Sequence, residues 1–194
     1  MKFGCVIPAR YGSTRLPGKP LADIAGKPMI ERVYDRVSQA TKTACTIVAT
    51  DDDRVYSAVQ QFGGTVMMTD PNHPTGTDRL AEVASYYTDL DVVINVQGDE
   101  PMIDPNLIDD LAHLFEEDPN LQMATVATPL LEEEYEEPSA VKVILNNRND
   151  AMYFSRSLIP YPRHDFVRPP LKHIGIYAYR REFFFVPVLN HPAH

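Results

Sequence analysis

The sequence has 194 residues, which suits one domain, and 44% of them are hydrophobic, enough for a sizeable core and too many for a globally disordered chain. Its formal charge of −9, from 27 acidic against 18 basic residues, argues against a protein that mainly binds nucleic-acid backbones. Two cysteines, Cys5 and Cys45, are too few for a disulfide scaffold or a zinc cage, and both lie in apolar runs that favour buried, inert thiols.

The first apolar run ends before Pro8, which makes it too short for the core of a signal peptide. No stretch of the sequence reaches the roughly 18 apolar residues that a membrane-spanning helix needs. We therefore expect a soluble protein of the reducing cytoplasm.

Up to about residue 130, short apolar runs alternate with segments whose apolar residues recur at helical spacing. Strands are predicted at 3–7, 46–49, 65–68, 92–96 and 123–127. Helices are predicted at 29–37, 55–62, 80–87 and 107–115, with prolines near two of the starts and Gly63-Gly64 ending the second helix. This alternation predicts an α/β fold with a mostly parallel sheet flanked by helices.

The pattern changes after about residue 130. An acidic run at 132–137 predicts a solvated loop or helix end, and the prolines between 160 and 170 exclude regular structure there. Further strands are predicted at 141–145, 151–154 and 174–179, the last interrupted by Gly175. We expect one domain over 1–194: a core at about 1–130, a mixed β extension at 131–182 and an atypical tail at 183–194.

The loop after the first predicted strand, Pro8–Leu21, combines glycines and prolines with three cations, Arg10, Arg15 and Lys19. A loop at the carboxyl end of a parallel strand lies where open α/β sheets bind ligands, and glycine backbones with Arg and Lys side chains suit a phosphate. The loop matches neither the Walker pattern nor G-x-G-x-x-G. An ordinary surface loop with solvated cations is an equal alternative from spacing alone.

Asp99 directly follows the predicted strand at 92–96 and Gly98. If the sheet is parallel, its carboxylate stands level with the cationic loop, where a hard cation such as Mg²⁺ would bridge it to substrate phosphates. Gly98 would allow close approach of a ligand. An aspartate that caps a helix or closes a turn explains the same residues equally well.

Several segments together resemble one family, the 3-deoxy-manno-octulosonate (Kdo) cytidylyltransferases, also called CMP-Kdo synthetases. The resemblance covers essentially residues 3–182. Its N-terminal signature is IPARYGSTRLPGKPL at 7–21. The other matches are GKPMI at 26–30, IVATDD at 47–52, GTDRLAEV at 76–83, NVQGDEPMI at 95–103, AVKV at 140–143, YFSRSLIP at 153–160 and HIGIYAYR at 173–180.

The resemblance implies a Rossmann-like nucleotidyltransferase that joins CTP to Kdo, releases pyrophosphate and serves lipopolysaccharide biosynthesis in Gram-negative bacteria. It implies Mg²⁺ as cofactor, CTP and Kdo as partners, and a homodimer as the family's state. The net charge and the lack of a long apolar stretch predict no nucleic-acid or membrane partner. In this frame, 1–130 binds the nucleotide and 131–182 provides sugar and dimer contacts.

The resemblance also assigns residues to roles. It implies catalytic roles for Arg10, Arg15, Lys19 and Asp99, with Asp99 as metal ligand. The residues implied in nucleotide binding are Pro8, Ala9, Arg10, Ser13, Arg15, Lys19, Thr77 and Arg79. Without it, Thr77 or Asp78 would cap a helix and Arg79 would be solvated.

The implied sugar-binding residues are Gln97, Arg156, His173 and Tyr177. An arginine suits the sugar carboxylate in a two-point contact, and the other three suit its hydroxyls. His173 and Tyr177 share one face of a strand around Gly175. The residues alone favour structural roles for this histidine and tyrosine.

The match fades after about Glu182. Family members continue with E-Q-x-E-x-L-E-Q-L-R, which takes part in the site and the dimer contact, and with V-D-T-P-x-D-L, whose aspartate is a second metal ligand; this sequence ends FFFVPVLNHPAH. The alternatives are therefore a catalytically impaired truncated remnant that still binds CTP, and an enzyme that activates another acidic sugar, 8-amino-Kdo or a sialic acid.

Overall fold

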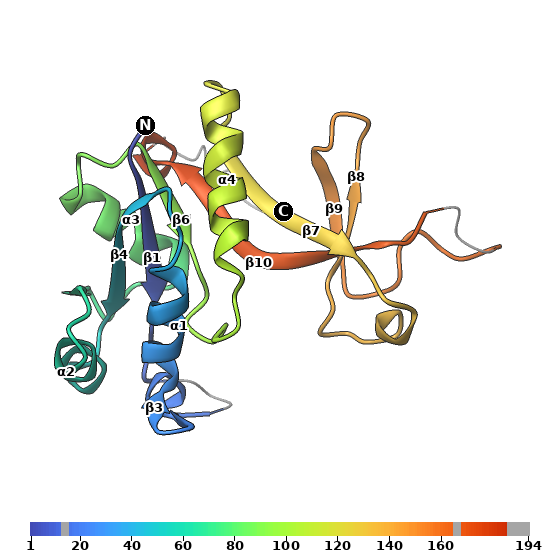
Figure 1. Ribbon diagram of the computed structural model, residues 1–194. Coiled ribbons are helices and arrows are strands. Elements are labelled where there is room, and N and C mark those ends of the chain that lie inside the picture. Colours follow the sequence, from blue (N-terminus) through green and yellow to red (C-terminus); the bar gives the residue numbers. More distant parts are fainter. Residues whose placement is uncertain (13–15, 165–167, 186–194) are drawn as a thin grey trace. The chain divides into compact units, whose positions relative to one another are not determined.

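The computed structural model describes residues 1–12, 16–164 and 168–185 (Figure 1). By internal contacts the chain forms two compact units. The first comprises Met1–Ala124 together with the described residues from Ile176 onward, and the second is Thr125–Gly175. No described helix combines the length and apolar character that crossing a membrane requires.

The first unit contains the predicted parallel sheet. Its strands are β1 (Phe3–Pro8), β4 (Thr43–Thr50), β5 (Val66–Met68) and β6 (Val92–Asn95), in the order β5-β4-β1-β6. All three neighbouring pairs among them are parallel. The last four residues of β10 (Leu171–Arg180) add to this sheet antiparallel to β6. The predicted α/β class with a mostly parallel sheet is confirmed.

Four α-helices lie among the described residues of this unit, at the positions that helical periodicity predicted. They are α1 (Met29–Val37), α2 (Asp53–Gln61), α3 (Gly76–Tyr86) and α4 (Pro105–Glu117). Gly63 follows α2 with φ of +79°, a conformation that glycine adopts without strain and that explains the predicted stop. Pro28 precedes α1 as its cap residue rather than opening the helix.

Helices cover both faces of the sheet, with α1 and α4 on one face and α3 on the other (Figure 1). On the α3 face, Leu80 and Val83 pack against Val6, Ile47 and Val93, and all five side chains are fully buried. Because side chains alternate along a strand, the neighbours of these sheet residues point to the opposite layer. Because side chains on both faces of the sheet are buried, the strands are held firmly in place. The candidate site lies at the ends of these strands.

The second unit consists mainly of antiparallel strands. It contains most of β7 (Met123–Pro129), the 3-10 turn η2 (Glu132–Glu134), β8 (Lys142–Leu145), β9 (Ala151–Ser155) and the start of β10. Strand β8 pairs antiparallel with both β9 and β10, and Lys142 stands opposite Lys172. The strands predicted at 141–145 and 151–154 are therefore confirmed within a residue or two.

Three local features differ from the sequence predictions. Strand β10 is continuous through Gly175, because an extended glycine does not end a strand whose neighbours supply hydrogen bonds. The loop at 8–21 contains a 3-10 turn, η1 (Lys19–Leu21). It is followed by a hairpin of two short strands, β2 (Asp23–Ile24) and β3 (Lys27–Pro28). Cys45 is only partly buried, whereas Cys5 is fully buried and its pKa is raised by desolvation.

Candidate functional site

A pocket of about 320 Å³ opens at the carboxyl ends of β1 and β6, where parallel α/β sheets bind ligands. These two strands are neighbours, and the chain leaves each of them at the same edge of the sheet. The residues that line the pocket are Pro8, Ala9, Arg10, Lys19, Pro20, Gly76, Gln97, Gly98 and Asp99. Five of the residues predicted for a nucleotide or catalytic role thus share one cavity: Pro8, Ala9, Arg10, Lys19 and Asp99.

Gly98 brings the two strand ends together. A Cβ atom added at this position would lie 2.7 Å from the backbone oxygen of Pro8, closer than real Cβ contacts allow. The ladder continues beyond β6 through a hydrogen bond from the Val96 amide to the Val6 carbonyl at 3.0 Å. The end of β1 therefore approaches Gly98 closely, while the close approach of a ligand at Gly98 stays a prediction.

Lys19 and Asp99 meet across this pocket. Lys19 Nζ lies 2.5 Å from Asp99 Oδ2, although the two residues are 80 positions apart. Both side chains remain partly exposed. The helix that follows is capped by Asp104, whose carboxylate accepts a hydrogen bond from the Asn106 amide, so Asp99 does not cap it. The turn alternative is confirmed, because Asp99 lies in a turn in which the Glu100 amide donates to the Gln97 carbonyl at 3.3 Å. The described loop thus brings a cation and the strand-end acid together, whereas Arg15 and Ser13 lie outside the described residues.

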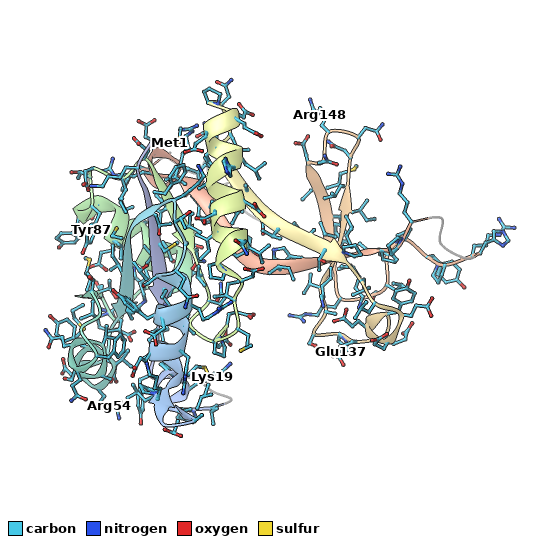
Figure 2. All side chains as sticks on the ribbon, in the orientation of Figure 1. Met1, Lys19, Arg54, Tyr87, Glu137 and Arg148 are labelled. Carbon is cyan, nitrogen blue, oxygen red and sulfur yellow. The ribbon has the colours of Figure 1, made fainter. Side chains whose placement is uncertain are left out.

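The backbone around Lys19 explains how the loop presents this lysine. Gly18 adopts φ of +73° immediately before η1, and its amide donates to the Tyr11 carbonyl at 2.9 Å. The Arg54 guanidinium lies over the Tyr11 ring, 3.3 Å from its centre, and a Cβ on Gly18 would lie 3.1 Å from the same ring. Figure 2 shows Lys19 and Arg54 at the same end of the first unit. No local pattern predicts this anchor, because Tyr11 and Arg54 are remote in sequence.

Arg10 lines the pocket beside the start of α3. Its Nη2 donates to the carbonyl of His73 and, at 3.4 Å, to that of Thr75. Thr75 also caps α3 in a reciprocal capping box with Asp78. Gly76, the first residue of α3, lines the same pocket, so a helix N-terminus and a guanidinium face one cavity. Both features attract anions.

Two predictions on α3 need correction. Thr77 does not cap the helix, because Thr75 takes that position, and Thr77 lies exposed in the first turn. Arg79 is not solvated: its side chain is fully buried, donates to the Thr69 hydroxyl and pairs with Asp51 at 2.7 Å, while its role in nucleotide binding stays a prediction. The helical period turns Arg79 toward the sheet, and this buried pair ties α3 to the end of β4.

The predicted sugar-binding residues are divided between the two units. In the first unit, Gln97 lines the pocket, while Tyr177 packs against the core with its ring 6.1 Å from that of Tyr179. Burial raises the pKa of Tyr177, so its phenol stays protonated around neutral pH.

In the second unit, His173 and Arg156 both have specific partners. His173 Nε2 lies 2.9 Å from the Thr125 hydroxyl, and its ring meets that of Phe154 edge-on. Burial lowers the pKa of His173 and favours the neutral imidazole. Arg156 is exposed, and its Nη1 donates to the Pro138 carbonyl at 2.7 Å.

A metal ion at this site would depend mainly on Asp99. Within the described ranges, no three acidic, histidine or cysteine side chains come together as a ready-made metal cage. Asp99 is the single carboxylate among the described residues that line the pocket. One protein carboxylate with substrate phosphates is a donor set that suits Mg²⁺, so the chemistry of the pocket fits such an ion.

Comparisons with known proteins agree with this geometry. A family model described as cytidylyltransferase matches residues 4–189. A "3-deoxy-manno-octulosonate cytidylyltransferase" from Escherichia coli is 55% identical over 177 residues, which cover 91% of this chain and 72% of that protein. An "8-amino-3,8-dideoxy-manno-octulosonate cytidylyltransferase" from Shewanella baltica (strain OS195) is 48% identical over 187 residues, with 94% and 76% covered. A solved structure of CMP:2-keto-3-deoxy-manno-octonic acid synthetase complexed with CTP superimposes with a TM-score of 0.90 at 54% identity, covering 95% of this chain and 76% of that one.

Proposed function

Because the chain belongs to the cytidylyltransferase family, we propose that it transfers CMP from CTP to Kdo, releases pyrophosphate and thereby serves lipopolysaccharide biosynthesis. The observation that carries this proposal is the pocket in which Arg10, Lys19 and Asp99 converge at the ends of β1 and β6. Two cations suit a triphosphate, and the carboxylate suits the divalent cation that accompanies it.

The reaction needs little covalent chemistry from the protein. The anomeric hydroxyl of the sugar attacks the α-phosphorus of CTP in line, a new P–O bond forms, the α–β P–O bond breaks, and the hydroxyl proton is released. Negative charge grows on the phosphoryl oxygens and on the leaving pyrophosphate. Arg10 and Lys19, with Arg15 from the same loop, stabilise that charge and hold the triphosphate.

Nucleotide contacts come from the same end of the sheet. Pro8 and Ala9 present backbone at the end of β1, and the exposed Thr77 lies in the first turn of α3, whose start lines the pocket. Ser13 extends this set through the cationic loop. Arg79 would support this set through its pair with Asp51, since its own side chain is fully buried.

Asp99 would hold a divalent cation, and we propose that this cation is Mg²⁺. When bound, Mg²⁺ would neutralise phosphate charge and polarise the P–O bonds. Lys19, which pairs with Asp99 in the free protein, would then be available to the phosphates. The ion pair between Asp99 and Lys19 would therefore break when the nucleotide binds. Asp99 would then hold the cation, and Lys19 would bind the phosphates.

Arg156 would bind the sugar carboxylate, while Gln97, His173 and Tyr177 would contact the hydroxyls. A neutral His173 and a protonated Tyr177, both favoured by burial, can each donate and accept hydrogen bonds. We also propose a cytoplasmic location, where CTP is available.

The test combines binding with turnover. Calorimetric titration with CTP and Mg²⁺ should show saturable binding, and added Kdo should give pyrophosphate. Binding without pyrophosphate release would identify a protein that binds CTP without catalysing the transfer, and absence of both would refute the proposal.

A second candidate sugar is supported by the Shewanella relative, whose name specifies 8-amino-3,8-dideoxy-manno-octulosonate. Competition between this sugar and Kdo at equal concentration would measure the ratio of their kcat/KM values. A ratio that favours the amino sugar would replace Kdo in the proposal, and a sialic acid in the same assay tests the remaining alternative.

A further inference from the structure

Lys142 is a fully buried lysine at the start of β8, and the proposed mechanism does not use it. Its Nζ donates to the Glu137 carbonyl at 2.8 Å and to the Arg156 carbonyl at 3.3 Å. Among the described residues, no carboxylate lies within ion-pair distance of this ammonium group. Burial of a lysine against two backbone carbonyls is costly, so a specific structural arrangement must require it.

Both acceptors belong to the surroundings of one side chain, that of Arg156. The backbone of Arg156 accepts from Lys142, and its guanidinium donates to Pro138, the residue after Glu137. Lys142 thus joins the loop around Glu137, which Figure 2 labels, to the segment that leaves β9. The Arg156 backbone is thus linked through Lys142 to Glu137, and the Arg156 guanidinium binds Pro138 directly.

The acidic run at 132–137 is mostly exposed, as predicted, and hydrogen bonds and an ion pair also hold it in place. Ser139 donates its amide to Glu137 Oε1 at 3.0 Å, and Lys172 pairs with Glu134. The pKa of Glu137 is lowered, mainly by hydrogen bonds from Ser139 and further by the charge of Lys142. A loop fixed at several points provides a rigid support for Arg156.

We propose that Lys142 is a positioning residue that fixes Arg156 in the conformation that receives the sugar carboxylate. This inference rests on the proposed function and on the role proposed there for Arg156. A long arginine on the exposed segment after β9 loses conformational freedom when it binds its ligand, and a prior restraint reduces that loss. The carbonyl held by Lys142 restrains the backbone, while Pro138 restrains one guanidinium nitrogen and leaves the others for a carboxylate.

Lys172 provides the matched control. It stands directly opposite Lys142 in the β8–β10 ladder and also binds the acidic segment, but through Glu134 and without a contact to Arg156. A general weakening of this unit would affect the variants K142M and K172M alike. A positioning role predicts that only K142M changes the interaction with the sugar.

The experiment measures steady-state pyrophosphate release with CTP and Kdo varied separately. We expect K142M to raise KM for Kdo about tenfold, while KM for CTP stays within about twofold, because only sugar binding depends on the restraint. K172M should leave both constants within about twofold of the wild-type values. The double variant K142M/R156A should match R156A in KM for Kdo, since Lys142 acts through Arg156.

Several outcomes would overturn the inference. One is an equal rise in KM for Kdo in K142M and K172M. Another is a rise in KM for CTP in K142M as large as its rise in KM for Kdo. A third is a KM for Kdo in K142M/R156A that combines the effects of the two single variants. If K142M does not fold, K142Q replaces it, because glutamine keeps a donor without the buried charge. K142Q should raise KM for Kdo above the wild-type value, and an unchanged KM for Kdo refutes the role. A wild-type chain without turnover refutes the proposed function and this role together, whereas turnover without the KM difference refutes this role alone.

Discussion

Replacement of Asp99 by asparagine separates the stability of the fold from its chemistry. The change keeps the shape of the side chain and removes its charge. The ion pair with Lys19 is lost, but the two side chains are 36% and 44% exposed, so water and salt already screen the attraction. Such a pair contributes less than about 1 kcal/mol to stability, which for a chain of this size lowers Tm by no more than about 4 °C.

The effect of D99N on catalysis should be much larger. Loss of the carboxylate that would hold the divalent cation should lower kcat by at least about a hundredfold, as expected when a charge-stabilising group is removed from a reacting phosphate. The assay is pyrophosphate release at saturating CTP and Kdo over a range of Mg²⁺ concentrations, beside urea unfolding of the same samples.

Glu100→Gln is the control, because this neighbouring exposed acid is not among the residues that line the pocket. E100Q should keep a rate within about threefold of the wild type. A D99N protein that retains a near-normal rate at ordinary Mg²⁺ would remove Asp99 from the mechanism. A large loss of stability in D99N would show that the pair with Lys19 is structural.

Three further substitutions test other parts of the structure. Gly98→Ala places a Cβ atom 2.7 Å from the Pro8 carbonyl, so it should destabilise the fold by about 1–3 kcal/mol and lower kcat/KM for CTP; unchanged urea unfolding would disprove this tight approach. Arg79→Met leaves Asp51 without its buried partner and should cost about 3–5 kcal/mol, whereas an intact fold with a selective rise in KM for CTP would return Arg79 to the nucleotide site. His173 has a pKa that burial lowers, so the unfolded chain binds more protons, and stability falls as pH drops below the ordinary histidine pKa of about 6.5. His173→Gln should therefore lose less stability than the wild type between pH 7.5 and 5.5, and parallel curves of urea midpoint against pH would contradict the assignment.

Periodicity predicted the first unit well because its signals are local. The continuous apolar run before Asn95 indicates a strand buried on both faces, and Gly63 after α2 marks a conformation that few other residues adopt. The predicted interruption at Gly175 was wrong because it also rested on a local signal. Glycine weakens strands, but only the tertiary structure shows that neighbouring strands hold this residue extended.

Arg79 and Lys142 show where prediction from sequence stops. Nothing local distinguishes a buried cation from a solvated one, since burial depends on what packs above the side chain. Asp51 lies 28 residues from Arg79, and the Arg156 carbonyl lies 14 residues from Lys142. These partners become visible only when the folded chain brings them together.

Sequence alone determined the alternation of strands and helices, the cationic loop and the acid at the end of a strand, because each is a pattern within a few residues. Tertiary structure decided which of these groups meet: β6 pairs beside β1, so Asp99 reaches Lys19 across 80 positions. It also buried the Arg79 side chain and brought the Lys142 ammonium group to the Arg156 carbonyl. The physical reason is that local backbone preference selects the elements, whereas burial on both faces of the sheet selects their neighbours.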